Sequence, residues 1–197
     1  MKPALLSVPN IVLCVPKYKR KPPEIILWSR VYQNRCGATG LQEAGKQLAW
    51  LRSQLAEQQA RRSTVWLVHH IPWGIDAYST LHSQADRCAS GIVSFLRDDI
   101  SGELFALLRQ YAGTITASFS AHTHYDDFRL LMDHSGKPVL IDKMVPAISP
   151  IFGQDPGFQV FNYDLARGTP LDYTSYYLAN LDVLSSSVTG DWRERYV

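Results

Sequence analysis

The 197-residue sequence contains only three cysteines, Cys14, Cys36 and Cys88, and no two of them form a C-x-x-C pair. This odd number argues against a disulfide framework and against a zinc knuckle. No apolar run approaches the ~20 residues that a membrane-spanning helix needs. The first apolar stretch is a poor signal peptide, because Pro3 and Pro9 interrupt it and most of the nearby positive charge follows it. We therefore expect a chain without an export signal, whose compartment stays open.

Two signatures of other hydrolases are absent or misplaced. No G-x-S-x-G motif occurs, which excludes the serine nucleophile of an α/β-hydrolase. An H-x-H motif is present, as in amidohydrolase barrels, but it stands at 122–124. That position is far from the first strand of a ~250-residue barrel, where such an enzyme needs the motif. We set both classes aside.

Charge is limited and unevenly distributed. Charged residues make up 19% of the chain and the net charge is +2, yet residues 1–37 contain seven Lys/Arg and one acidic residue, Glu24. We interpret residues 1–24 as an unassigned basic arm. Such an arm can bind nucleic acid, but no nucleic-acid-binding motif accompanies it. The hydrophobic content of 46% indicates a globular protein.

Hydrophobic periodicity predicts an α/β protein. A helix is expected over residues 41–60, where apolar residues recur at spacings of three and four: Leu41, Ala44, Leu48, Leu51 and Leu55. A second helix is expected over 101–112, with Asp99 or Ser101 as its cap. Apolar or alternating runs predict strands at 25–29, 64–69, 114–120, 127–133, 138–145 and 157–164. The long polar connection over 75–100 is functional or contains short helices, and residues 171 onward show no strong pattern.

Two of the predicted strands end in histidine. His69 and His70 follow the strand after the first helix, and His122 and His124 follow the strand at 114–120. Side chains two apart in extended backbone point to the same side, so His122 and His124 can face one cation or two neighbouring cations. His70 joins them if the two strands are neighbours. Three neutral imidazoles suit zinc, iron or manganese. The alternative for each histidine is a hydrogen-bonded core residue.

Carboxylates for such a site are not evident in the sequence. A two-metal hydrolytic site normally includes carboxylates, one of which often bridges the metals. Four nearby aspartates show no ligand spacing and are interpreted as turn or solvent-facing residues: Asp76, Asp126, Asp127 and Asp142. His82 and His134 lie in a polar loop and a hairpin turn, and no role is assigned to them.

Four motifs follow one another in a familiar order: Gln-Leu-x-Trp-Leu at 47–51, VHHIPWG at 68–74, SAHTHYDDFRL at 120–130 and AISPIFGQDPGFQVFNYD at 147–164. Together they resemble the acid-sphingomyelinase-like phosphodiesterases, a group of calcineurin-like metallophosphoesterases. His69 replaces a glycine of the family pattern, Trp73 a proline, and Ala121 the glycine before His122. The resemblance covers residues 25–181 and leaves 182–197 as a tail.

This resemblance implies a metallophosphoesterase sandwich of mixed β-sheets flanked by helices. It also implies two divalent metal ions, with zinc ahead of iron or manganese, and a small-molecule or lipid-headgroup phosphodiester as substrate. His70 and His122 would bind one metal and His124 the other. Intact relatives are often secreted or periplasmic.

Three ligand motifs that the family places before the first helix have no counterpart here: Asp-x-His, Gly-Asp-x-x-Asp and Gly-Asn-His. We therefore expect the C-terminal half of the domain, lacking its N-terminal strands. Such a chain would be a truncated hydrolase with impaired activity, and its exposed sheet edge would favour self-association. The alternative is a non-catalytic metal-binding remnant or module.

Overall fold

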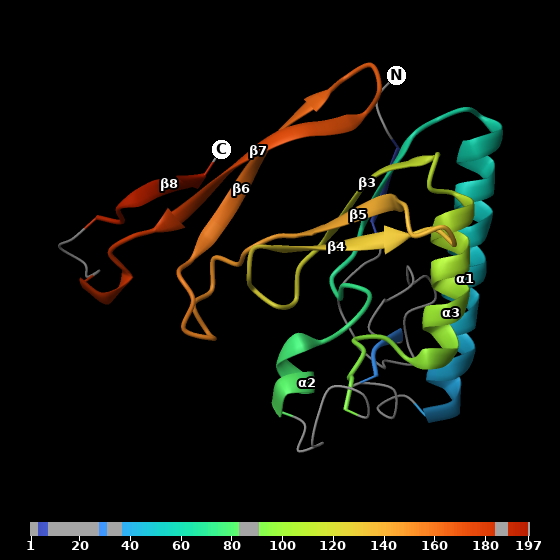
Figure 1. Ribbon diagram of the computed structural model, residues 1–197, viewed down its shortest axis with the longest axis horizontal. Coiled ribbons are helices and arrows are strands. Elements are labelled where there is room, and N and C mark those ends of the chain that lie inside the picture. Colours follow the sequence, from blue (N-terminus) through green and yellow to red (C-terminus); the bar gives the residue numbers. More distant parts are fainter. Residues whose placement is uncertain (1–3, 8–27, 31–36, 83–90, 184–188, 197) are drawn as a thin grey trace, which may run out of the picture.

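The computed structural model describes residues 4–7, 28–30, 37–82, 91–183 and 189–196. Figure 1 shows the elements in chain order: β1 (Ala4–Ser7), α1 (Gly37–Ala60), β2 (Val65–Val68), α2 (Ala77–His82), α3 (Asp98–Gln110), β3 (Ile115–Ser120), β4 (Asp127–Met132), β5 (Pro138–Met144), β6 (Gly157–Asp164), β7 (Thr169–Leu178), the 3-10 turn η2 (Leu181–Val183) and β8 (Trp192–Tyr196). None of the helices within these ranges is long and apolar enough to cross a membrane.

The larger sheet is mostly parallel and has the strand order β1-β2-β3-β5-β4. Strands β1, β2, β3 and β5 run parallel, and β4 pairs antiparallel with β5 through the hairpin predicted from the sequence. Because β2 and β3 are parallel neighbours, their carboxyl ends reach the same edge of the sheet. The histidines that follow these two strands therefore start from neighbouring positions.

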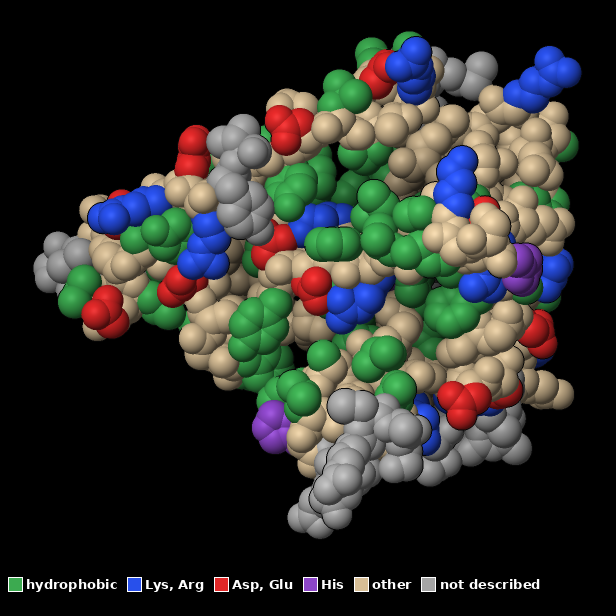
Figure 2. Space-filling view, in the orientation of Figure 1, with side chains coloured by type: hydrophobic (Ala, Val, Ile, Leu, Met, Phe, Trp, Pro, Cys, Tyr) green, Lys and Arg blue, Asp and Glu red, His purple; other side chains and the backbone are tan. Residues whose placement is uncertain are grey.

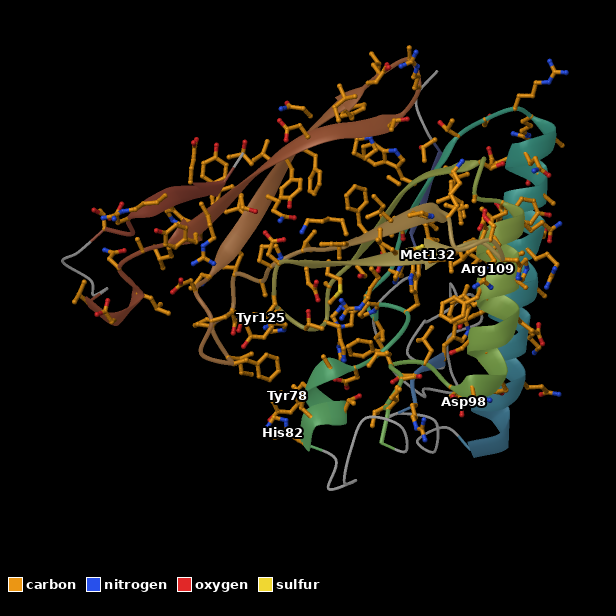
Figure 3. The ribbon with its side chains drawn as sticks, in the orientation of Figure 1. Tyr78, His82, Asp98, Arg109, Tyr125 and Met132 are labelled. Carbon is orange, nitrogen blue, oxygen red and sulfur yellow. The ribbon has the colours of Figure 1, made fainter. Side chains whose placement is uncertain are left out.

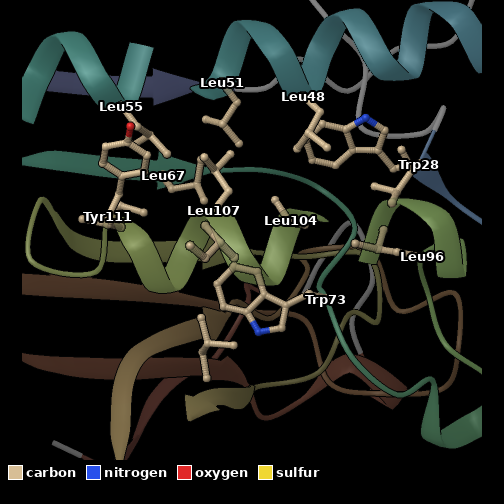
Figure 4. Packing of buried hydrophobic residues seen from close by; sticks show 14 of the residues in the cluster. Trp28, Leu48, Leu51, Leu55, Leu67, Trp73, Leu96, Leu104, Leu107 and Tyr111 are labelled. Atoms are coloured by element: carbon tan, nitrogen blue, oxygen red, sulfur yellow. The ribbon is translucent and has the colours of Figure 1, made fainter. Parts of the chain in front are cut away.

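The hydrophobic core lies between this sheet and two helices. Figure 1 shows α1 and α3 running side by side, and Figure 4 shows their leucines meeting over β2. The predicted stripe of α1 is confirmed from Ala44 onward, because Ala44, Leu48, Leu51 and Leu55 are all buried. The side chain of Leu41, the first residue of that stripe, lies outside the described part of the structure. Leu104, Leu107 and Leu108 of α3 complete the cluster together with Val65 and Leu67 of β2.

The smaller sheet, β6-β7-β8, is antiparallel and packs near β3. Trp66 of β2 and Thr116 of β3 both donate to the Gly168 carbonyl, at 2.6 Å and 2.7 Å. The Phe119 and Phe161 rings meet edge to face across the two sheets, 5.0 Å apart. The predicted fold class of mixed sheets flanked by helices is confirmed, and the arrangement is consistent with a partial metallophosphoesterase sandwich.

The start of the second helix differs from the prediction. Helix α3 begins at Asp98, and its N-cap residue Arg97 makes no side-chain cap bond. The predicted caps are therefore wrong: Asp99 lies in the first turn, paired with Arg97, and the Ser101 hydroxyl donates back to the Arg97 carbonyl at 2.9 Å. Two acidic residues in the first turn favour the helix electrostatically in place of a cap.

Three strands lie where the sequence showed no pattern. β1 falls inside the arm at 1–24, while the basic run at 15–24 and residues 25–27 of the predicted strand 25–29 lie outside the described residues. β7 and β8 occupy most of the stretch from 169 onward, and β8 lies within the predicted tail. Pairing with neighbouring strands, rather than a side-chain alternation of their own, fixes β7 and β8. The long connection at 75–100 contains the short helix α2, as expected.

Candidate functional site

His70 and His122 meet at the carboxyl ends of β2 and β3. His70 Nε2 lies 3.3 Å from His122 Nδ1, and the two rings cross nearly at right angles with their centroids 5.1 Å apart. The Ala121 amide donates to the His70 carbonyl at 2.9 Å, so the backbone also joins the two loops. The expectation that these strands are neighbours is confirmed, and it brings two of the three predicted histidines together.

The backbone around His122 is in an unusual conformation. His122 and His124 have φ angles of 70° and 67°, in the left-handed region that few residues other than glycine adopt. The Thr123 amide donates to the Ala121 carbonyl at 2.8 Å, which closes a three-residue γ-turn centred on His122. Such a turn with positive φ is rare and strained, and strained residues of this kind cluster at functional sites.

His124 does not share the position of His122. The rule that side chains two apart point the same way holds only for extended backbone, and both histidines have a positive φ. The expectation of an extended H-x-H segment is therefore wrong. His124 instead packs against the Phe152 ring, and its Nδ1 accepts from the Gln154 amide at 3.4 Å.

Both histidines of the pair are held in the neutral form. Burial lowers the pKa of His70, and the neighbouring His122, His124 and His69 lower it further. Burial also lowers the pKa of His122, against a smaller opposing effect of Asp76. A neutral imidazole has the free lone pair that a metal ligand needs.

The spacing of the pair fits two ligands of one metal. Two nitrogens that bind a tetrahedral zinc at about 2.0–2.1 Å lie about 3.3–3.4 Å apart. The observed separation of 3.3 Å matches this edge. Across the described residues, however, no three His, Cys, Asp or Glu side chains converge on one point. The pair would therefore supply two of the four ligands of a tetrahedral site.

All four nearby aspartates have other partners, and three of them lie in or next to loops. Asp76 caps α2, accepting from the Ser79 amide at 2.9 Å and from its hydroxyl at 2.6 Å. Asp127 pairs with Arg129 at 2.6 Å and is partly exposed, as expected of a turn residue. Asp126 is less exposed than expected, because it binds the Lys143 ammonium and accepts from Ser175 at 2.8 Å.

The prediction that Asp142 faces solvent is wrong. The Asp142 side chain is 0% exposed. Its carboxylate accepts from the Ser118 hydroxyl at 2.7 Å and the Ser120 hydroxyl at 2.6 Å, and His69 Nε2 lies 3.2 Å away. We call these four residues, His69, Ser118, Ser120 and Asp142, the Asp142 cluster. They lie directly beneath the strand ends that carry His70 and His122.

A cavity of about 240 Å³ opens beside His124. It lies between the loop after β5 and the strands β7 and β8, and its lining includes His124, Tyr125, Gln154, Tyr176 and Arg195. Figure 3 labels Tyr125 on the loop between β3 and β4. His124 therefore borders a space that a small molecule can enter, whereas the His70–His122 pair is half-buried next to it.

Comparisons with known proteins identify the relatives of this chain. No protein-family model matches it. It is 29% identical over 160 residues to the cyclic GMP-AMP phosphodiesterase SMPDL3A of Bos taurus, covering 78% of this chain and 33% of that protein. It is 24% identical over 174 residues to the acid sphingomyelinase-like phosphodiesterase 3b of Mus musculus, covering 84% of this chain and 36% of that protein. The chain is related to the acid-sphingomyelinase-like phosphodiesterases.

The relationship also extends to human sphingomyelin phosphodiesterase, which is 25% identical over 138 residues. The chain spans about a third of the length of the SMPDL3A and 3b relatives that it matches. The names of these relatives are those of phosphodiesterases. The substrates in those names belong to the whole relatives.

Sequence reasoning missed the Asp142 cluster for an identifiable reason. An aspartate inside a predicted strand next to a lysine looks like a residue of the solvated face. The usable signal was the pairing of small hydroxyl residues, Ser118 and Ser120, on one face of the neighbouring strand. These polar side chains at spacing two required a buried polar partner across the sheet.

Proposed function

We propose that this chain carries part of a metal-dependent phosphodiester hydrolase. In this proposal His70 and His122 bind one divalent ion and His124 contributes to a second, with zinc first and iron or manganese as alternatives. The observation that carries the proposal is the 3.3 Å separation of His70 Nε2 and His122 Nδ1 across two strand ends. The relationship to named phosphodiesterases supplies the reaction class.

When bound, the metals would activate a water molecule and hold the phosphate oxygens for in-line attack. The chain's own residues would prepare that site. Burial keeps His70 and His122 unprotonated, and the edge of Phe95 packs against His122 with ring centroids 5.8 Å apart, which excludes water from one side of the ring. The Ala121–His70 backbone bond keeps the two loops together.

We expect the 197-residue chain to turn over slowly by itself. Two neutral imidazoles leave the charge of two divalent ions uncompensated, and hydrolytic two-metal sites normally include carboxylates. In the described part of the chain no aspartate or glutamate joins the histidine pair in a group of three. Impaired activity is therefore part of the proposal.

The proposed substrate is a small-molecule or lipid-headgroup phosphodiester. The cavity beside His124 is a suitable place for the group attached to the phosphate, because Tyr125 and Tyr176 offer aromatic surface and Arg195 offers a positive charge. Arg195 also pairs with Asp155 at 3.2 Å and lies over the Tyr177 ring, which fixes its position.

The test is a metal titration coupled to an assay with bis(p-nitrophenyl) phosphate. The purified, untagged chain is dialysed, and bound zinc, iron and manganese are measured for the wild type and for His70→Ala/His122→Ala. His134→Ala, in the exposed hairpin turn, is the matched control. We expect metal binding and slow, metal-dependent cleavage that the double substitution removes and the control keeps. A wild type that binds no metal contradicts the proposal.

A second candidate function is a metal-binding module without turnover. The observation that favours it is again the lack of a converging carboxylate within the described ranges. The same experiment separates the two, because this module would bind metal through His70 and His122 but leave the phosphodiester intact at every metal concentration.

We also propose that the chain self-associates through β4. This strand ends the described order of the larger sheet, and its exposed side chains are Phe128, Leu130 and Met132, with Ile141 of β5 beside them. Figure 2 shows hydrophobic side chains at the surface over β4 and β5. An edge strand with an apolar face is a template for pairing with a second copy of the chain.

A further inference from the structure

Asp142 is a buried charge in the middle of a strand that carries no proposed ligand. It is 0% exposed and lies on β5, beside β3. Isolated buried carboxylates are unfavourable, so the position persists only because donors surround the side chain. Ser118 and Ser120 supply two of them, at 2.7 Å and 2.6 Å, and His69 supplies a third partner at 3.2 Å.

The His69 ring is fixed at both nitrogens. Nδ1 lies 2.9 Å from the Ile71 carbonyl, and Nε2 faces the Asp142 carboxylate. Each ring nitrogen therefore has a hydrogen-bonding partner, which fixes the orientation of the ring. Trp73 stacks on the ring with centroids 5.3 Å apart, which closes the remaining side.

Two of the three partners of Asp142, His69 and Ser120, adjoin the loops that carry the histidines of the pair. His69 directly precedes His70. Ser120 is the last residue of β3, two residues before His122, and its carbonyl accepts from the Val145 amide at 2.9 Å. The Asp142 carboxylate therefore connects the end of β2 to the end of β3, where the two strands leave the sheet.

The turn that presents His122 requires such support. A left-handed residue at φ 70° inside a γ-turn persists only where the surrounding structure determines it from several sides. Two backbone hydrogen bonds hold the turn directly: the Thr123 amide donates to the Ala121 carbonyl, and the Ala121 amide donates to the His70 carbonyl. Fixing Ser120 immediately before the turn supplies a further restraint.

A purely stabilising role accounts less well for the cluster. A buried ion pair gives little net stability compared with apolar residues of the same volume. The Asp142 cluster connects the two loops that carry His70 and His122. A cluster that only stabilised the fold would not need to lie between these loops.

We propose that Asp142 is a positioning residue for the His70–His122 pair, acting through His69 on one loop and through Ser120 on the other. This proposal rests on the proposed function insofar as the pair binds metal. The positioning itself concerns the metal-free chain and can be tested without metal.

The experiment compares Asp142→Asn with the wild type in two measurements on the full chain. The first is the nuclear Overhauser contact between the His70 and His122 rings in the metal-free protein. The second is the zinc affinity, measured by competition with a chelator. Leu108→Ala is the matched control, because Leu108 is fully buried on α3, outside the cluster, and its loss also destabilises the fold.

We expect Asp142→Asn to weaken the ring contact and to lower zinc affinity by about tenfold or more, the effect typical of removing a group behind a metal ligand. Leu108→Ala should leave the His70–His122 ring contact and the zinc affinity unchanged. If Asp142→Asn does not fold, Ser120→Ala removes one bond and keeps the charge, and it should change both measurements in the same direction by less. Equal ring contacts and zinc affinities in the cluster variant and the control would overturn the proposal. If the wild type binds no zinc, the proposed function fails, and the ring contact alone decides on Asp142.

Discussion

Replacing either partner of the buried His69–Asp142 pair alone should lower the free energy of unfolding by nearly as much as replacing both partners together. His69→Gln leaves a fully buried carboxylate with only Ser118 and Ser120 as donors, and Asp142→Asn leaves a buried imidazole facing a neutral amide. Removing one member of a buried pair costs about 3–5 kcal/mol. We expect about 3 kcal/mol for each, the lower end, because the serine hydroxyls remain.

The double variant His69→Gln/Asp142→Asn replaces the ion pair by two neutral amides that can bond to each other. Its cost should be about 3–4 kcal/mol, well below the sum of the single losses, so the coupling free energy is about 2–3 kcal/mol, the range seen for residues in direct contact. Urea unfolding followed by tryptophan fluorescence at pH 6 measures all four proteins. Additive losses, within about 0.5 kcal/mol, would refute the reasoning.

The same pair sets a pH window. Burial alone would raise the pKa of Asp142, but the charge of His69 and the bonds from His69, Ser120 and Ser118 outweigh it and hold the pKa low. Burial alone would lower the pKa of His69, but the Asp142 charge and bond and the Ile71 carbonyl raise it. The carboxylate's contribution is present above its unfolded pKa of about 3.9 and is lost as the pH falls through the lower folded value.

The imidazolium's contribution is complete below its unfolded pKa of about 6.5 and is lost as the pH rises through the raised folded value. The stability advantage of the wild type over the double variant should therefore be largest between about pH 4 and pH 6.5. Urea unfolding from pH 3 to pH 9 measures it. An advantage that stays constant across this range would show that the pair is not ionised.

Two further predictions concern the sheets. Leu130→Lys places a charge on the exposed face of β4, close to Met132, whose carbonyl accepts from Arg109 at 2.7 Å (Figure 3). This charge should shift the chain toward the monomer, which light scattering measures as a lower mass. An unchanged mass would exclude this face as the site of self-association. Trp66→Phe removes one of the two donors to the Gly168 carbonyl and leaves the Thr116 hydroxyl as the other. The free energy of unfolding should therefore fall by about 0.5–1 kcal/mol. An unaltered urea midpoint would contradict a stabilising role for the Trp66 bond between the sheets.

Local pattern was sufficient for much of the framework. Spacings of three and four specified the buried face of α1, since a helix that packs on a sheet must place its leucines on one side. The short apolar runs before His69 and after Thr114 specified β2 and β3 for the same reason. The order of the motifs was sufficient to recognise the relatives, because order and spacing survive where identity falls to 24–29%.

The sequence by itself thus determined which segments form the core, and which two strands end in histidine. Only the tertiary structure decided that the segment carrying His122 and His124 is not extended, because nothing in the letters H-T-H specifies a positive φ. It also decided that Asp142 is buried, since the serines that bind it lie on another strand more than twenty positions earlier. Strands β7 and β8 were settled by pairing within the smaller sheet, which their own side-chain alternation does not reveal.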